Sequence, residues 1–317
     1  MEIKVLFENS RINLNFKSGH GLSLLINYSG KKYLFDAGAN KKLVYNATKM
    51  GETLNDLEAV IISHGHSDHT GGLRYLKSGN APIYTAEGVT LPHYLKILTT
   101  FLYVGIPKNE ILKMHENLHT IKTKTELAPS FHIIPLGKAN STTKNLYKKM
   151  DDKFVYDDFS DELLVVIEQE DGLIVFTGCS HHGIIDMMEI ALETFPTKPI
   201  KYLIGGFHMI GIPYINNLGL PEQEVMKIGN KLNDSRVEKI LTCHCTGSKA
   251  FNILKTQLGN KLEAIKEISH FSDSLPFSFT LCIFNKCILL QFSKVVDFIS
   301  HIFIVILGFC LDKKLLL

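Results

Sequence analysis

The sequence has little net charge, and this absence bears on its partners. Its 317 residues contain 34 Lys plus Arg and 32 Asp plus Glu, which leaves a formal net charge of +2. Nucleic acids and anionic membranes are bound through clusters of Lys and Arg, so the balance of charges favours neither as a partner. We therefore expect neither a nucleic acid nor a membrane as a partner.

We also expect neither a signal peptide nor a disulfide framework. The first residues, MEIKVLFENS, contain no basic segment followed by an apolar core. Three of the six cysteines, Cys179, Cys243 and Cys245, lie close to histidines, and a chain of this length builds its core without disulfide bonds. Reduced thiols and a cytoplasmic location are expected.

The last part of the chain lacks a run long enough to span a membrane as a helix. Residues 269–317 are rich in Phe, Ile and Leu, but the longest stretch there without Asp, Glu, Lys or Arg is 298–311, 14 residues. A spanning helix needs about 20. We expect a hydrophobic C-terminal extension of unclear role, either packed on the domain or a partner, or poorly ordered.

What is present is the alternation of strand and helix patterns typical of an α/β domain. The chain is 45% hydrophobic and 21% charged, which is enough apolar material for a globular core. Short apolar runs such as LEAVIIS, LIVFTG, KYLIGG and VEKILT read as buried strands, and helical patterns follow several of them. The pattern predicts one domain over 1–268, with 100–160 as an insertion or lid.

Four residues of metal-binding type follow the run LEAVIIS, in the order His-x-His-x-Asp-His. Residues two apart on an extended segment point the same way, so His64 and His66 can share one metal ion. The turn that follows can deliver Asp68 and His69 to a second ion. A solvated His-rich loop is the alternative, but four such side chains at the end of a buried strand favour a metal site.

Three further histidine-containing motifs follow other strand-like runs. HGHSDH, CSHH, GGFH and CHC together contain seven of the 14 histidines. Open α/β proteins place their ligands at the carboxyl ends of strands, so these four loops are expected to converge.

Together, LFDAG, SHGHSDHTGG, FTGCSHHGI, GGFH and HCTG resemble the metallo-β-lactamase superfamily. They resemble in particular its branch similar to the dihydropterin-dependent synthase of methanopterin biosynthesis. The resemblance extends over about residues 2–265. It implies a four-layer αββα sandwich with two divalent metal ions at one edge, between the sheets. Zinc is the first choice for these ions, with manganese and iron as alternatives.

The resemblance implies a ligand set for each ion. His64, His66 and His181 would hold the first, and Asp68 and His69 the second. Asp68 would also have a catalytic role, because it would both bind an ion and orient the attacking water.

Four other positions receive roles with open alternatives. His208 is the first choice to complete the second ion's ligands, and His244 is the second choice. Cys179 stands where many members carry a bridging Asp. Its thiolate could bridge the ions, water alone could do so, or the cysteine could be buried and inert. Asp36 would orient a ligand from behind, or be purely structural.

The resemblance implies a metal-dependent hydrolase or transferase that acts on a small anionic, phosphorylated substrate. In the narrower reading an arylamine displaces pyrophosphate from a dihydropterin diphosphate. The alternatives are a generic metallo-hydrolase of phosphoesters or lactones and a non-catalytic metal-binding module. On the substrate side we expect His20, His244, Thr246 and Gly247, for which a satisfied polar residue and a plain helix cap are the structural alternatives.

Overall fold

The computed structural model describes residues 1–10, 14–76, 81–107, 111, 117–140, 145–212, 215–265, 268–270, 280–283 and 286–289. The chain divides into two units, one of residues 3–269 and one of residues 1–2 with 270–317. Most of the predicted C-terminal extension lies outside the described residues. Its described strands, β21 (Thr280–Ile283) and β22 (Lys286–Leu289), pair antiparallel. No described helix has the length and apolar character needed to cross a membrane.

The larger unit is built on two seven-stranded sheets. The first has the order β20-β1-β2-β3-β4-β5-β8. Its strands are β1 (Glu2–Phe7), β2 (Ser23–Tyr28), β3 (Lys31–Phe35), β4 (Leu57–Ile61), β5 (Ile83–Ala86), β8 (Leu118–Ile121) and β20 (Ile268–His270). Strands β3, β4, β5 and β8 run parallel to one another.

The second sheet has the order β19-β18-β15-β14-β13-β10-β9. Its strands are β9 (Thr125–Ala128), β10 (Phe131–Pro135), β13 (Leu163–Gln169), β14 (Gly172–Phe176), β15 (Ile200–Gly205), β18 (Val237–Thr242) and β19 (Leu262–Ala264). Here β14, β15, β18 and β19 are parallel.

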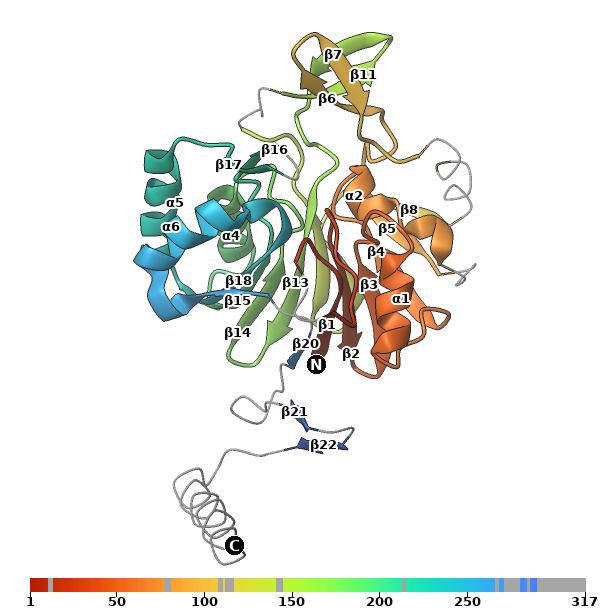
Figure 1. Cartoon of the computed structure of the whole chain (residues 1–317), viewed down its shortest axis with the longest axis vertical. Coiled ribbons are helices and arrows are strands. Elements are labelled where there is room, and N and C mark those ends of the chain that lie inside the picture. The colour runs from red at the N-terminus through yellow and green to blue at the C-terminus, as the bar shows by residue number, and fades with distance from the viewer. Residues whose placement is uncertain are drawn as a thin grey trace, which may run out of the picture. The chain divides into compact units, whose positions relative to one another are not determined.

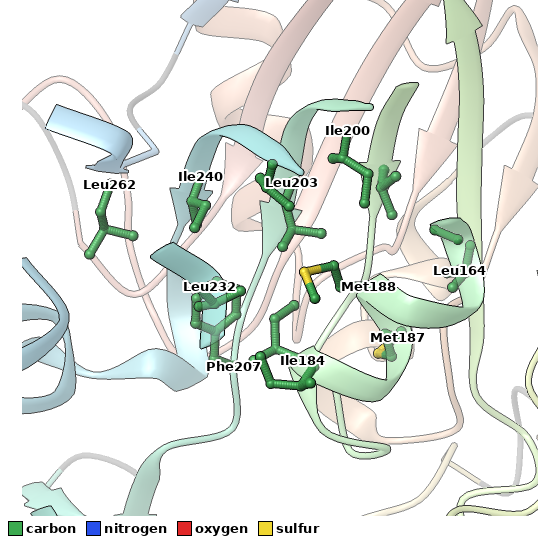
Figure 2. Packing of buried hydrophobic residues seen from close by; sticks show 14 of the residues in the cluster. Leu164, Ile184, Met187, Met188, Ile200, Leu203, Phe207, Leu232, Ile240 and Leu262 are labelled. Atoms are coloured by element: carbon green, nitrogen blue, oxygen red, sulfur yellow. The ribbon is translucent and has the colours of Figure 1, made fainter. Parts of the chain in front are cut away.

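Helices cover the outer faces of both sheets (Figure 1). The first sheet carries α1 (Lys42–Lys49), and the second carries α4 (Ile184–Thr194), α5 (Glu222–Asp234) and α6 (Ser248–Leu258). Alternate residues of β13 explain the layering, because Leu164 and Val166 join the core under these helices, whereas Leu163 and Val165 point to the other face. Figure 2 shows Met187, Met188 and Leu203 in this core.

Aromatic side chains fill the space between the two sheets. Tyr33 of β3 packs on Phe131 of β10 with ring centroids 4.7 Å apart, and Phe35 packs on Phe176 of β14 at 5.8 Å. These contacts join the inner faces of the two sheets, and helices lie outside both. The predicted αββα sandwich is confirmed.

A third, four-stranded sheet has three of its strands inside the interval 100–160 predicted as an insertion or lid, and its first strand just before that interval. It has the order β12-β11-β6-β7 and consists of β6 (His93–Ile97), β7 (Thr100–Tyr103), β11 (Leu146–Met150) and β12 (Lys153–Tyr156). Strands β8, β9 and β10 fall inside the same interval but belong to the two large sheets. Their sequences are short and partly polar, which hid them in the sequence.

Several short elements complete the domain. They are α2 (Ser67–Thr70), β16 (Ile210–Ile212), β17 (Ile215–Leu218) and the 3₁₀ helices η1 (Leu73–Tyr75), η2 (His244–Thr246) and η3 (Gly259–Lys261). Because β4, β14, β15 and β18 are parallel within their sheets, the loops after them emerge at one edge. The four histidine motifs follow these strands.

Candidate metal centre

Three imidazoles meet after β4 and β14. Nε2 of His64 lies 3.0 Å from Nδ1 of His66 and 3.2 Å from Nε2 of His181. In a tetrahedral zinc site with Zn–N distances of about 2.0–2.1 Å, neighbouring nitrogens lie about 3.3 Å apart. A neutral imidazole carries one N–H and one bare nitrogen, so three ring nitrogens that face one another cannot all be paired by good hydrogen bonds. The three nitrogens therefore fit a shared cation, and we name them the first ligand group.

The electrostatics of this group favour the neutral, metal-binding form of each ring. Burial lowers the pKa of His66 to about 3, helped by His93 nearby. Burial and the neighbouring histidines also hold the pKa of His64 and His181 well below the usual range. Nδ1 of His181 is buried and has no hydrogen-bond partner among the described residues. A divalent cation is bound by neutral imidazole, so the rings are in the required state at neutral pH.

A second ligand group combines a carboxylate with two imidazoles. Nε2 of His244 lies 3.3 Å from Oδ2 of Asp68 and 3.2 Å from Nε2 of His69. Burial alone would lower the pKa of His69, but Asp36 and Asp68 raise it to about 9. The surroundings therefore favour a positive charge at this point. A divalent cation supplies that charge, and carboxylate and imidazole are ligands for zinc, iron or manganese.

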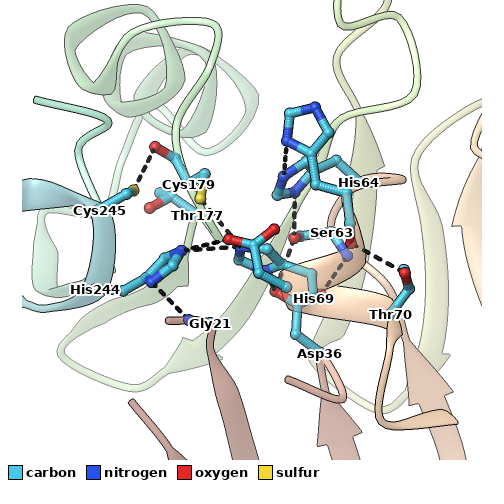
Figure 3. A network of polar contacts seen from close by, with 12 residues as sticks. Gly21, Asp36, Ser63, His64, His69, Thr70, Thr177, Cys179, His244 and Cys245 are labelled. Atoms are coloured by element: carbon cyan, nitrogen blue, oxygen red, sulfur yellow. Dashed lines mark hydrogen bonds and ion pairs between the residues drawn. The ribbon is translucent and has the colours of Figure 1, made fainter. Parts of the chain in front are cut away.

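Cys179 lies between the two ligand groups. Its Sγ is 3.0 Å from Nε2 of His69. It also lies within 4.8 Å of the ligand nitrogens of His64 and His181 on one side, and of His69 and His244 on the other. Figure 3 shows the thiol beside His69 and His244. Burial raises the pKa of the Cys179 thiol well above its usual range. A bound cation favours the thiolate, so a thiol here fits a bridging position.

Asp36 supports one histidine of each group from behind. Its Oδ2 accepts a hydrogen bond from Nδ1 of His69 at 2.6 Å and another from the Ser63 hydroxyl at 2.8 Å. The Ser63 Oγ lies 2.9 Å from Nδ1 of His64 (Figure 3). Asp36 is fully buried and has a positive φ of 58°. Asp36 thus contacts His69 directly and His64 through Ser63.

A segment of buried acids supports the first ligand group, and we call residues 157–162 the acidic strap. Oδ2 of Asp161 accepts a hydrogen bond from the backbone N–H of Gly65 at 2.7 Å. Asp157 binds Nδ1 of His93 at 2.6 Å, and the His93 ring contacts that of His66 with centroids 5.4 Å apart. The strap therefore fixes the loop between His64 and His66.

The same strap also positions His181. Both carboxylate oxygens of Glu162 accept backbone N–H groups, from His181 and His182, at 2.8 Å each. The ring of Phe159 stacks on the His181 ring at 4.4 Å. His182 itself donates to Glu162 and to a backbone carbonyl, which agrees with a supporting role. We did not predict these residues, and the acid-rich run DDFSDE was the available signal.

The two candidates for completing the second group lie in different places. The ring of His208 contacts that of His181, with centroids 4.2 Å apart, and the backbone N–H of His208 donates to Sγ of Cys245 at 3.2 Å. His244 contacts Asp68 and His69. We predicted His208 ahead of His244; the structure places His244 beside Asp68 and His69, and His208 near Cys179 and Cys245. Both histidines have a positive φ, 46° for His208 and 51° for His244, so the direction of neither ring follows from a regular strand or helix pattern.

The residues predicted on the substrate side differ in their positions. Nε2 of His20 lies 3.1 Å from Oδ2 of Asp68, and His20 lines a cavity that also contains His66 and His181 in its wall. The Thr246 hydroxyl accepts the backbone N–H of Phe207 at 2.9 Å, so it already links the loops after β15 and β18. Thr246 and Gly247 line a separate cavity of about 450 Å³ on the other side of His244.

A cavity of about 440 Å³ opens onto both ligand groups. Its polar lining includes Arg74, which sequence reasoning missed although it follows His69 closely in HTGGLRYL. Its apolar lining includes Leu95, Val104 and Leu146. Arg74 is the one Lys or Arg among the residues that line this cavity, and it therefore offers a fixed positive charge to an anionic ligand.

The chain is similar to proteins of known family. A sequence model described as the metallo-beta-lactamase superfamily matches residues 18–191. The 7,8-dihydropterin-6-methyl-4-(beta-D-ribofuranosyl)-aminobenzene-5'-phosphate synthase of Methanocaldococcus jannaschii is 28% identical over 276 residues, which are 80% of this chain and 90% of the synthase.

Solved structures have the same architecture. Tm1679, described as a metal-dependent hydrolase of the beta-lactamase superfamily, is 31% identical with a TM-score of 0.73, and the match covers 86% of this chain and 99% of Tm1679. Zn²⁺-bound PqqB from Methylobacterium extorquens is 11% identical with a TM-score of 0.52, over 86% of this chain and 100% of PqqB, and shares the fold. Sequence match, architecture and ligand groups agree: the chain belongs to the metallo-β-lactamase superfamily.

Proposed function

We propose that the chain is a dinuclear metal-dependent hydrolase or transferase that acts on a small anionic, phosphorylated substrate. The observation that carries this proposal is the meeting of two ligand groups on either side of Sγ of Cys179. Imidazole, carboxylate and thiolate ligands together favour zinc over magnesium or calcium. Zinc is therefore the first metal to test, with manganese and iron after it.

In this proposal His64, His66 and His181 hold the first ion, and Asp68, His69 and His244 hold the second. In the first group Nε2 of His64 lies 3.0 and 3.2 Å from ring nitrogens of His66 and His181. In the second group Nε2 of His244 lies 3.2 and 3.3 Å from His69 and Asp68, which are 3.8 Å from each other. Cys179 takes the bridging position. His208, which neighbours His181 and lines the cavity, takes a place beside the substrate.

Two such ions supply Lewis acidity and make hydroxide available near neutral pH. The protein's own groups orient the reactants. Asp68 points Oδ2 at both His244 and His20, so His20 holds the carboxylate in place from the cavity side. Arg74 lines the same cavity and would bind a phosphate oxygen of the substrate. These groups favour an anionic substrate whose reacting centre lies next to Asp68.

The attacking group distinguishes two versions of the reaction. Similarity to the synthase over 80% of the chain supports transfer, in which an arylamine displaces pyrophosphate from a dihydropterin diphosphate. Similarity to Tm1679, described as a metal-dependent hydrolase, supports the alternative of a phosphoester or lactone hydrolase. A cavity of about 440 Å³ suits a small molecule in either version and is too small for a nucleic-acid duplex.

The test combines metal analysis with a substrate panel. Wild-type protein and His66→Ala are purified, loaded with Zn, Mn or Fe, and assayed for bound metal and for turnover. The panel contains phosphodiesters, thioesters, lactones and a dihydropterin diphosphate with an arylamine. His119→Ala is the matched control, because His119 is exposed on β8. The proposal requires about two ions per chain in the wild type and the control.

The proposal is supported if His66→Ala loses bound metal and turnover while His119→Ala keeps both. A fully metal-loaded, active His66→Ala protein would contradict it. A metal-loaded wild type inactive on the whole panel would favour the third possibility, a non-catalytic metal-binding module. Formation of an arylamine adduct rather than a hydrolysis product decides in favour of transfer.

A further inference from the structure

The small sheet of β6, β7, β11 and β12 presents two chemically different faces. In the antiparallel pairs, Tyr94 stands opposite Tyr103 and Tyr147, so aromatic side chains share one face. Leu95 stands opposite both Leu102 and Leu146, so aliphatic side chains share the other. The two faces of the sheet can therefore have different roles.

On the aromatic face the rings pack against one another. Phe101 stacks on Phe154 at 3.9 Å, Tyr147 stacks on Tyr156 at 4.8 Å, and Lys96 lies over the ring of Phe101. These contacts hold the strands together. The ring contacts give the aromatic face an internal structural role, and Phe154 and Tyr156 remain 41% and 53% exposed on it.

The aliphatic face continues the wall of the metal cavity. Leu95, Leu146 and Val104 line the cavity, and Val104 lies opposite His93 on this face because its N–H donates to the His93 carbonyl. The backbone N–H of Ser67, in the metal-binding loop, donates to the Val104 carbonyl at 2.7 Å. The base of the face is thus attached directly to the metal-binding loop.

Beyond the cavity the same face is exposed. Leu102, in register with Leu95, is 45% exposed, and Ile97 at the end of β6 is 42% exposed. An apolar surface that continues from a cavity onto exposed aliphatic side chains is typical of a site that binds a ligand or a partner. We define the aliphatic strip as Leu95, Ile97, Leu102, Val104 and Leu146.

We propose that the aliphatic strip binds an elongated apolar portion of the substrate, whose anionic head lies at the metal centre and Arg74. This inference rests on the proposed function and narrows its substrate class to anionic amphiphiles, in which an alkyl or aryl group extends from the reacting centre. Continuity with the cavity favours this occupant over a second copy of the chain, because three of the five strip residues line the cavity itself.

The experiment uses straight-chain alkylphosphonates from methyl to octyl, below their micelle concentrations, titrated calorimetrically into the zinc-loaded protein. Burial of each added methylene is expected to raise affinity by about two- to fourfold once the chain reaches the strip. Leu102→Ser and Ile97→Ser should flatten this dependence for the longer chains and leave methylphosphonate affinity unchanged. Met226→Ser is the matched control, since Met226 is 44% exposed on α5, away from the small sheet and outside the cavity lining.

The outcomes separate this inference from the proposed function. If phosphonates bind with an affinity that does not depend on chain length, the strip does not bind the alkyl chain, and the proposed function is unaffected. Absence of binding by every phosphonate overturns both. An unchanged chain-length dependence in Leu102→Ser and Ile97→Ser overturns the strip, as does a wild-type dimer that these two substitutions convert to a monomer, because the face would then belong to a second copy.

Discussion

Oδ2 of Asp36 lies 2.6 Å from Nδ1 of His69, and both side chains are fully buried. The contact fixes the tautomer of the imidazole, since the proton on Nδ1 leaves Nε2 free to bind a cation. The carboxylate also receives the Ser63 hydroxyl, which approaches Nδ1 of His64. A single acid thus controls the ring orientation in both ligand groups.

Asp36→Asn should therefore weaken metal binding without changing side-chain volume. An amide N–H next to Nδ1 removes the acceptor that holds the His69 tautomer, and loss of such a partner costs about 10- to 100-fold in metal affinity. Competition with a chromogenic chelator measures the affinity of each metal equivalent. Asp56→Asn, at an exposed surface acid, is the control. Equal affinities in both variants would show that Asp36 has no such role.

The acidic strap leads to a different prediction, for the first ligand group. Asp161→Asn weakens the hydrogen bond to the Gly65 N–H, which holds the loop between His64 and His66. We expect about a tenfold loss of affinity for one of the two metal equivalents. Asp158→Asn is a matched control in the same strap, because Asp158 pairs with Lys148 away from the ligands.

The strap prediction needs a readout that separates positioning from stability. Thermal unfolding of the metal-free proteins supplies it, since a purely structural effect would lower the melting temperature of the apo form. The Co²⁺-substituted proteins supply a second, because displaced imidazoles change the visible absorption of bound cobalt. An Asp161→Asn protein with unaltered cobalt spectra and chelator competition would contradict the role assigned to the strap.

Sequence pattern predicted the parts of the site that are local in the chain. His64, His66, Asp68 and His69 follow one strand within six residues, so spacing alone brings them together. The αββα fold followed from strand and helix alternation together with family resemblance. The choice between His208 and His244 was different, because it depends on two left-handed backbone turns that no periodicity records.

Residues brought together from distant segments were also missed. His93 of β6 and Asp157 after β12 meet behind His66 through strand pairing across the small sheet. From the sequence we predicted only an insertion or lid over residues 100–160, with scattered lysines and a run of acids, and no contact with the ligands. Burial of Asp157 and Glu162, at 1% and 0% exposure, is a property of the assembled structure. The C-terminal extension stays a prediction, since most of it lies outside the described residues.

The stability of the metal-free protein should pass through a maximum close to neutral pH. The folded-state pKa of His66 is about 3, below its unfolded value of about 6.5, so the stability that this group contributes is lost as pH falls through that window. The folded-state pKa of His69 is about 9, so its contribution is complete below about 6.5 and is lost as pH rises to 9.

Urea unfolding of chelator-treated protein at pH 5, 6.5 and 8.5 measures this profile. We expect the largest free energy of unfolding at pH 6.5. Metal-loaded protein should lose the decline at high pH, because the cation replaces the proton on His69. A free energy of unfolding that rises from pH 5 through pH 8.5 in the metal-free protein would contradict the charge assigned to His69.

Arg74 offers a prediction that bears on substrate charge. Its guanidinium is exposed and lines the metal cavity, where a phosphate oxygen would accept its N–H groups. An exposed ion pair of this kind contributes about 1 kcal/mol, so Arg74→Ala should raise KM for phosphorylated substrates by about five- to tenfold. KM for uncharged lactones should change little, and kcat should change little for both. Arg236→Ala is the control, since Arg236 contacts the Pro196 carbonyl, outside the cavity lining. Equal changes in KM for charged and uncharged substrates would instead assign Arg74 to the shape of the cavity, through its bond to the Gly71 carbonyl.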